Sequence, residues 1–429
     1  MKRLVGTQEI IVKQLVEERL TNQVNQKTVD TAVAEIIANV RKKGDDALFA
    51  YSQQFDKMTL TSLEIGQEQI AKAFDEIDST VLLALKNAKI NIETYHRQQL
   101  ETGFEDKPSE GVIRGQLVRP LSRVGVYVPG GTAAYPSSVL MNVLPAKIAG
   151  VKEVIMITPP QEHFNPAILV AASLSGVDKI FQIGGAQGIA ALAYGTQTIP
   201  KVDKITGPGN IYVATAKKQV FGLVGIDMIA GPSEIGIIAD DSANARFVAA
   251  DLLSQAEHDV LARTILVTNS KRLADEVEKE LAYQLERLPR KDIAQKALNN
   301  HGCIIIAETV EEMFALMNEV APEHLEVALD EPYAYLDLIE NAGSIFLGHY
   351  TSEPIGDYYA GTNHILPTSG TARFYSALGV HDFVKRMQYI QYNKPAVAKA
   401  STDIMTLAYA EGLSAHARAI EIRQEGEKS

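Results

Sequence analysis

An acid and an imidazole stand side by side in the segment Ala321-Pro322-Glu323-His324-Leu325. Pro322 is expected to end the preceding helix and to leave Glu323 and His324 on a turn. A carboxylate and an imidazole can act as two separate proton acceptors if the turn directs both into a cleft. A solvated polar turn explains the same residues equally well, so the pair alone identifies no reaction.

A second pair, Gln255 and His258, lies three residues apart at the end of a predicted helix, so both side chains share one face. Histidine is a common zinc ligand, whereas glutamine is an unusual one. The spacing alone favours a surface helix end with a capping histidine. Asp357 and His416 lie in other turn-rich segments. Together with Gln255 and His258 they would form a mixed nitrogen and oxygen metal site without sulfur.

Two further carboxylate and imidazole pairs lie in turns. Asp357 and His364 are seven residues apart, and Glu411 and His416 lie on either side of a predicted helix break at Gly412. Taken alone, each pair is better explained as structural.

The chain has one cysteine, Cys303. This excludes an internal disulfide and any thiolate-rich zinc or iron–sulfur site, and it fits a reducing compartment. A catalytic thiolate needs an electropositive, partly exposed environment, but Cys303 begins the apolar run 303–307. We therefore expect Cys303 to be a buried strand residue.

Glycine-rich turns follow three predicted strands, whereas the P-loop and the Rossmann G-x-G-x-x-G motif are absent from the sequence. Such turns let backbone amides approach a phosphate at a helix N-terminus. One turn is weak support for nucleotide binding, and three in successive units are stronger. The turns span residues 129–132, 184–188 and 207–210.

The elements that must position these residues form two alternating series of short β-branched runs and helical patterns. The first predicts strands at 124–128, 153–158, 179–183 and 202–206, and the second at 235–239, 264–268, 303–307 and 344–347. Alternation on this scale predicts parallel sheets covered by helices, with a ligand cleft between the two units. The first hundred residues and those after Asp382 are predicted to be helical.

Composition indicates a folded enzyme of 429 residues, with 46% hydrophobic and 22% charged residues. A net charge of −12 without a basic run makes a nucleic-acid or anionic-membrane partner a poor candidate. The uncharged stretches 124–146 and 180–200 contain proline or glycine, so we expect buried strands, turns and helices rather than membrane spans. The N-terminus turns polar at once, which favours a cytoplasmic protein over a secreted one.

Eight blocks in the same order make the chain resemble the histidinol dehydrogenase family over almost its whole length. The resemblance implies two Rossmann-like open parallel-sheet domains, in an arrangement like that of aldehyde dehydrogenases, with helical arms at both ends. The blocks lie at 126–131, 184–187, 207–210, 230–234, 254–258, 321–324, 361–364 and 414–416.

The same resemblance implies the site residues. Zinc would be bound by Gln255, His258, Asp357 and His416, and Glu323 and His324 would accept protons. NAD would contact Tyr127, Gln187 and Asn210. The substrate would be surrounded by the zinc ligands and by four other residues, namely Ser233, His324, His364 and Glu411.

The family oxidises L-histidinol to L-histidine through an aldehyde and uses two NAD per substrate. It forms a homodimer in which the C-terminal segment of one subunit completes the site of the other. Two other readings of the residues are an aldehyde dehydrogenase with a cysteine nucleophile and a zinc hydrolase that uses Glu323 as its base.

These considerations together predict four parts of the chain. They are an N-terminal helical arm (1–24), a main α/β domain (25–126 and 233–378), a second α/β domain with the NAD contacts (127–232) and a C-terminal helical dimerisation segment (379–429).

Overall fold

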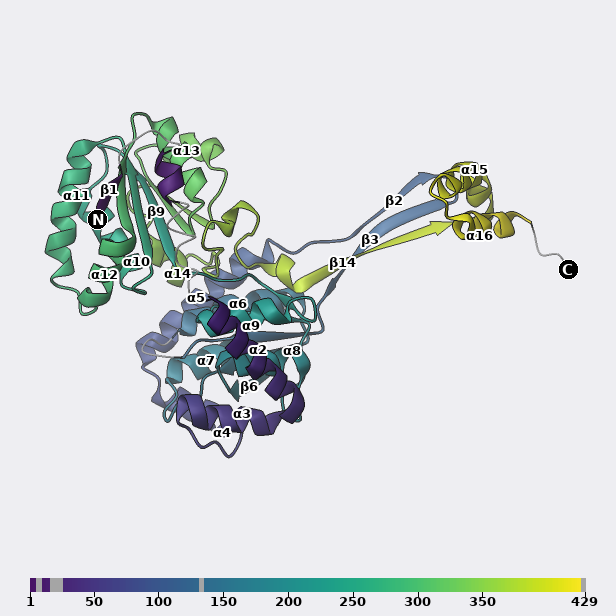
Figure 1. The fold of residues 1–429 in the computed structure, drawn as a ribbon, viewed down its shortest axis with the longest axis horizontal. Coiled ribbons are helices and arrows are strands. Elements are labelled where there is room, and N and C mark those ends of the chain that lie inside the picture. Colours follow the sequence, from purple (N-terminus) through teal and green to yellow (C-terminus); the bar gives the residue numbers. More distant parts are fainter. Residues whose placement is uncertain (5–9, 16–25, 131–134, 426–429) are drawn as a thin grey trace. The chain divides into compact units, whose positions relative to one another are not determined.

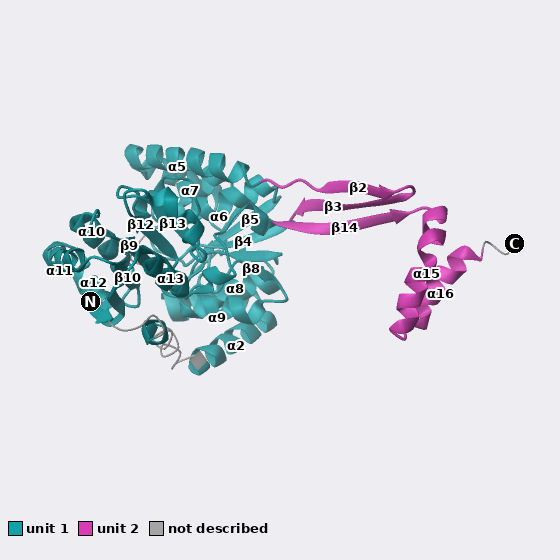
Figure 2. Ribbon diagram, turned by 90° about the horizontal axis from the view of Figure 1, so that it is seen from above, with its two compact units in different colours: residues 1–99, 121–383 teal, residues 100–120, 384–429 magenta. Residues whose placement is uncertain are grey.

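The computed structural model describes residues 1–4, 10–15, 26–130 and 135–425. The chain divides into two compact units, shown in different colours in Figure 2. Unit 1 contains residues 1–99 and 121–383, and unit 2 contains residues 100–120 and 384–429. Among the described residues, no helix is both long enough and apolar enough to cross a membrane.

The first sheet of unit 1 has six parallel strands in the order β1-β11-β10-β9-β12-β13. Both faces are covered, which explains why its central strands are nearly continuous runs of isoleucine, leucine and valine. Helices α10, α11 and α12 pack on one face, and α13 packs on the other (Figure 1). The strands are β1 (Lys2–Leu4), β9 (Glu234–Ala239), β10 (Arg263–Thr268), β11 (Gly302–Ile306), β12 (His324–Ala328) and β13 (Ser344–Leu347). The helices are α10 (Ala245–Ala256), α11 (Lys271–Leu285), α12 (Lys291–His301), α13 (Val310–Val320) and α14 (Glu353–Tyr358), with a 3₁₀ turn at Pro332–Leu338.

The second sheet has five parallel strands in the order β6-β5-β4-β7-β8. The strands are β4 (Arg123–Tyr127), β5 (Glu153–Thr158), β6 (Lys179–Gln182), β7 (Lys204–Thr206) and β8 (Gly225–Ile226). The helices connecting them are α6 (Pro136–Ala149), α7 (Pro166–Ser175), α8 (Gly185–Tyr194) and α9 (Ile211–Val220). Two parallel α/β sheets in one chain confirm the fold class expected from the sequence.

The helices before residue 100 pack on the second sheet. Helices α4 and α5 join α6 and α7 on one face, while α2 and α3 join α8 and α9 on the other. Their bounds are α2 (Gln26–Lys43), α3 (Asp45–Tyr51), α4 (Gln67–Glu76) and α5 (Ser79–Arg97), with a π-helical turn at Ser52–Asp56. The predicted main domain groups residues 25–126 with the first sheet, whereas these helices and β4 belong with the second. An apolar helix face does not reveal which sheet it covers.

Within the predicted N-terminal arm, Lys2–Leu4 forms strand β1 at the edge of the first sheet and pairs with β11. This strand replaces the start of the expected helical arm. Residues 10–15 are helical, and the remainder of the arm lies outside the described residues.

Unit 2 is a three-stranded antiparallel sheet, β14-β3-β2, followed by two helices (Figure 2). Its strands are β2 (Phe104–Ser109), β3 (Val112–Pro120) and β14 (Val384–Tyr392), and its helices are α15 (Lys394–Ala410) and α16 (Ser414–Gln424). Helices were expected throughout the C-terminal segment, and the predicted break at Gly412 is present with φ +73°. The prediction missed β14, whose partner β3 lies more than 260 residues earlier. Short 3₁₀ turns at Thr371–Arg373 and Val380–Phe383 belong to unit 1.

Candidate active site

Glu323 and His324 stand at the amino end of β12, in the interior of unit 1. The sequence prediction left both on a turn, but His324 is the first residue of a strand that pairs with β9 and β13. Helix α13 ends at Val320, and Ala321, which caps it, has φ +47°. Glu323 is 7% exposed and His324 is 3% exposed, so neither is a solvated turn residue.

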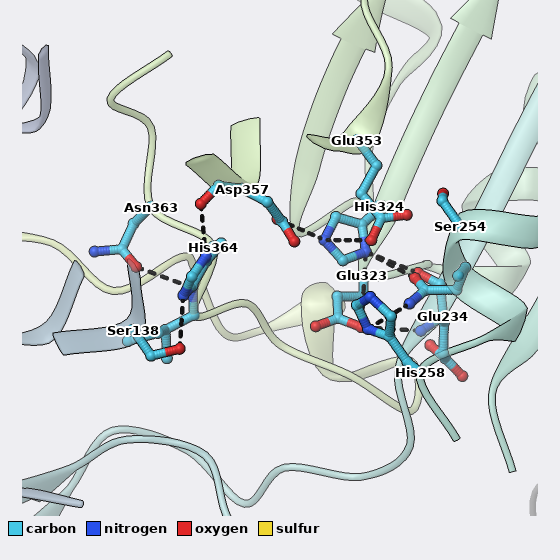
Figure 3. A network of polar contacts seen from close by, with 12 residues as sticks. Ser138, Glu234, Ser254, His258, Glu323, His324, Glu353, Asp357, Asn363 and His364 are labelled. Atoms are coloured by element: carbon cyan, nitrogen blue, oxygen red, sulfur yellow. Dashed lines mark hydrogen bonds and ion pairs between the residues drawn. The ribbon is translucent and has the colours of Figure 1, made fainter. Parts of the chain in front are cut away.

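The main chain of Glu234 orients both members of the pair (Figure 3). Its N–H donates to Glu323 Oε2 at 2.9 Å, and its carbonyl oxygen lies 3.1 Å from His324 Nδ1. Glu234 begins β9, the strand next to β12, which explains the contact. Its side chain is itself buried and forms an ion pair with Arg263 at 3.0 Å.

The contacts of His324 assign its tautomer. Nδ1 faces two acceptors, the Glu234 carbonyl and Gln255 Oε1, each at 3.1 Å. Nδ1 therefore carries a proton, and in the neutral ring Nε2 has the lone pair. His324 Nε2 is buried and finds no hydrogen-bond partner among the described residues. Its nearest carboxylate oxygens are Asp357 Oδ1 at 3.7 Å and Glu353 Oε1 at 4.0 Å.

Gln255 and His258 reach the same place from the end of α10. That helix follows β9 and runs back along the sheet, so its C-terminal end lies at the amino ends of the strands. Gln255 Nε2 lies 3.4 Å from His258 Nδ1, while Gln255 Oε1 faces His324. Gln255 is fully buried and His258 is exposed. The burial of Gln255 rules out the surface helix end that the spacing alone favoured.

Asp357 and Glu353 lie one helical turn apart in α14. One donor atom each from His324, Glu353 and Asp357 lie within 4.8 Å of one another, a spacing that could hold a metal ion. Sequence reasoning missed Glu353, although a carboxylate four residues before Asp357 shares its helix face. Glu353 is 2% exposed, and its Oε2 has no partner within the described part of the chain.

Burial and charge shift the pKa values of this cluster. Burial raises the pKa of Glu323 to about 8 and that of Glu353 to about 7. Burial opposes the charge on His324, but Glu353, Glu323 and Asp357 outweigh it and raise the pKa of the imidazole to about 10. A buried group of carboxylates around one imidazole favours positive charge at this place, either as a protonated imidazole or as a bound metal ion.

His364 lies beside this cluster and is held at both ring nitrogens. Nε2 lies 3.1 Å from Ser138 Oγ, and Nδ1 lies 3.0 Å from the carbonyl oxygen of Asp357 (Figure 3). The preceding Asn363 donates to the carbonyl oxygen of Met141 at 2.8 Å. Ser138 and Met141 belong to α6, so these contacts join the segment after α14 to the helix that follows β4.

The other predicted substrate residues belong to both units. Ser233 immediately precedes β9 and is partly buried, next to Glu234. Glu411 and His416 belong to unit 2, one at the end of α15 and the other in α16, and both are exposed. Three of the four predicted metal ligands therefore gather in unit 1, and His416 is not among them.

The predicted NAD residues lie at the carboxyl ends of the second sheet's strands. Tyr127 ends β4, and its hydroxyl accepts the N–H of Gly185 at 3.4 Å. Gln187 lies in the first turn of α8, and Tyr127 and Gln187 are each 3% exposed. Asn210 caps α9, where its side-chain oxygen accepts the N–H groups of Tyr212 and Val213. Because the side-chain oxygen of Asn210 is used in this cap, it is the side-chain nitrogen of this exposed residue that can donate to a ligand.

Comparison with known proteins identifies the family. A family described as histidinol dehydrogenase matches residues 19–424. The histidinol dehydrogenase of Streptococcus mutans is 69% identical over 425 residues, which cover 99% of this chain and 100% of that one. That of Listeria monocytogenes serovar 1/2a is 60% identical over 428 residues and all of both chains. The crystal structure of histidinol dehydrogenase from Elizabethkingia anophelis has a TM-score of 0.90 at 38% identity, covering 100% of this chain and 95% of that one.

Proposed function

Because this chain belongs to the histidinol dehydrogenase family, an oxidoreductase family of histidine biosynthesis, we propose that it uses zinc and NAD to oxidise L-histidinol through L-histidinal to L-histidine. The observation that carries the proposal is that several functional groups converge near Asp357. They are the buried acid Glu323, the unpartnered Nε2 of His324, and the amide–imidazole pair Gln255 and His258. These groups come from three separate segments of the chain, and they supply both metal donors and proton acceptors.

The residues present fit zinc. Gln255, His258 and Asp357 offer nitrogen and oxygen donors, and Glu353 adds a carboxylate beside them. The buried carboxylates carry a surplus of negative charge that a cation would compensate, and Glu353 Oε2 has no partner among the described residues. When bound, zinc would offset this negative charge and act as a template for the imidazole and amino nitrogens of L-histidinol.

The fourth ligand in this proposal is His416 from a second copy of the chain, with Glu411 of the same segment contacting the substrate. The exposure of both residues in unit 2 supports it, because an exposed imidazole is available to a neighbouring subunit. The active enzyme would then be a homodimer in which each C-terminal segment completes the partner's site.

The topology of the second sheet indicates where NAD would bind. In the second sheet the chain proceeds from β4 to β5 on one side and reaches β7 on the other, so the crevice between the ends of β4 and β7 is the topological switch point. Ligands of open α/β sheets bind at this point. Thr206 at the end of β7 is fully buried, with a hydroxyl that has no partner among the described residues. Tyr127, Gln187 and Asn210 surround the same edge. When bound, NAD would supply the hydride acceptor for each of the two oxidations.

Proton transfer falls to two residues of this chain. His324 Nε2 takes the hydroxyl proton of L-histidinol, since Nδ1 is already committed to Glu234 and Gln255. A bound cation would offset the carboxylates that raise the pKa of this imidazole, and so would leave Nε2 free to accept a proton. Glu323 then takes a proton from the water that attacks the aldehyde carbon, while His324 returns its proton to the aldehyde oxygen, which gives the hydrated aldehyde and restores His324 as a base. His324 accepts the hydroxyl proton of this hydrate in the second oxidation. Ser233 and His364 bind the substrate beside the pair.

Cys303 has no place in this chemistry. It lies in β11, is 4% exposed and packs in the core between the first sheet and α13, as the apolar run predicted. A buried thiol of this kind cannot serve the cysteine-nucleophile alternative. Nothing in the site favours hydrolysis over oxidation.

The stoichiometry of NADH tests the function. The zinc-loaded enzyme with limiting L-histidinol should yield two NADH per substrate, followed by absorbance at 340 nm, and chelation should abolish the reaction. One NADH per L-histidinol would exclude the second oxidation, and none would exclude the proposed function.

A further inference from the structure

A buried ion pair lies behind the glycine turn that follows β7. Lys217 of α9 and Asp227, which follows β8, form a direct contact between Nζ and Oδ1. Their side chains are only 3% and 1% exposed. No step of the proposed reaction uses them.

Both partners also bind the main chain of Gly207. The N–H of Gly207 donates to Asp227 Oδ2 at 2.8 Å, and its carbonyl oxygen accepts from Lys217 Nζ at 3.0 Å. Asp227 Oδ1 accepts in addition the N–H of Met228 at 2.7 Å. The N–H and the carbonyl oxygen of Gly207 are therefore both bound by a single ion pair.

The turn needs this support because its backbone is unusual. Gly207 has φ +110°, and a Cβ at this position would lie 2.1 Å from the carbonyl oxygen of Tyr127. The turn therefore passes directly against the end of β4, at the switch point. Three residues later Asn210 caps α9, so the position of Gly207 sets where Asn210 presents its free amide nitrogen.

Stability alone does not account for the pair. Removing two charges from water is costly, and a well-packed apolar pair of similar volume often stabilises a protein as well or better. An apolar pair could not, however, bind the N–H and the carbonyl of Gly207. The feature that requires these two residue types is the fixed geometry of the turn.

We propose that Lys217 and Asp227 are positioning residues for the dinucleotide, because they fix the Gly207–Asn210 turn in the conformation that receives NAD. The proposal rests on the proposed function, in which this edge of the second sheet binds NAD. It adds to that function two residues that touch neither substrate nor cofactor.

The test compares NAD binding by the zinc-loaded, full-length enzyme and three variants, using isothermal titration calorimetry. Lys217→Met removes the cation while keeping most of the buried volume. Asp227→Asn keeps the shape of the side chain but has one acceptor oxygen, whereas Asp227 uses both of its oxygens as acceptors. The matched control is Lys204→Met, which breaks a partly buried pair with Asp382, 2.8 Å apart, at the opposite end of β7.

We expect Lys217→Met to raise the Kd for NAD by about tenfold or more and Asp227→Asn by a smaller factor, with Lys204→Met unchanged. The KM for NAD should rise in parallel, while zinc content and the KM for L-histidinol stay at wild-type values. A pair that is only structural would lower the melting temperature without this selective effect on NAD.

A folded, zinc-loaded Lys217→Met enzyme with the wild-type Kd for NAD would overturn the proposal. If Lys217→Met does not fold, Asp227→Asn decides in the same way. Failure of the proposed function gives a different result, because the wild-type enzyme itself would then bind no NAD.

Discussion

Replacing Glu323 by glutamine should separate the two oxidations. The amide keeps the size of the side chain and an oxygen that can accept the Glu234 N–H, now 2.9 Å from Glu323 Oε2. It cannot accept a proton from water. Since positioned general bases contribute roughly 10²- to 10⁴-fold, aldehyde oxidation should fall by about that factor. Alcohol oxidation, which uses His324, should be much less affected.

The same residue predicts a pH dependence with a definite sign. A base must be ionised to act, and burial raises the pKa of Glu323 to about 8. The ionised fraction would be about one tenth at pH 7 and about nine tenths at pH 9. Zinc nearby would lower this pKa, so the rise in aldehyde oxidation between pH 7 and 9 should be about tenfold at most. Below the pKa the rate should fall as Glu323 becomes protonated.

Stopped-flow measurement of NADH provides the assay. With L-histidinol, a single turnover of the wild-type enzyme should release two NADH per site and that of Glu323→Gln about one. With L-histidinal, the variant should be slow and should lack the pH-dependent rise due to Glu323. His324→Gln is the matched control and should lose both oxidations. Equal rates of L-histidinal oxidation in Glu323→Gln and the wild type would refute the assignment of Glu323 as the base.

Three other substitutions test the fourth zinc ligand, the role of the cysteine and a buried ion pair beside the site. His416→Asn should lower zinc occupancy, measured by elemental analysis of the purified protein, and full occupancy would remove His416 from the ligand set. Cys303→Ser should keep catalytic turnover within a few-fold of wild type, because the thiol is buried away from the site; abolished turnover in a folded variant would revive the cysteine mechanism. Arg263→Met leaves the buried Glu234 carboxylate without its ion-pair partner and should destabilise the protein by about 3–5 kcal/mol in urea unfolding. An unchanged unfolding midpoint would contradict that account of the pair.

The two parallel sheets were accessible from the sequence because their strands are buried on both faces and appear as uninterrupted apolar runs. Strand β12 was missed because Glu326 interrupts its short apolar stretch and Pro322 suggested a turn. Strand β14 was missed for another reason: most of its residues are exposed, and its pairing with β3 depends on residues far away in the chain.

The residues of the site, like the strands, were only partly predictable from the sequence. The spacing of Gln255 and His258 correctly placed them on one helix face, but only the fold explains why that helix end meets β12. Glu353 could have been found from its position four residues before Asp357. The Lys217–Asp227 pair could not, because lysine and aspartate ten residues apart are ordinary in any sequence and only the return of the chain after β8 brings them together.

The pairing of β1 with β11 bears on the order in which the protein can fold during synthesis. Residues 2–4 are made about 300 residues before their partner strand. Strand β1 therefore stays unpaired for most of translation, and β3 likewise waits for β14. Contacts over such long separations form slowly, and an unpaired strand edge invites association with other chains. We infer that the nascent chain depends more on protection from aggregation than its final structure indicates.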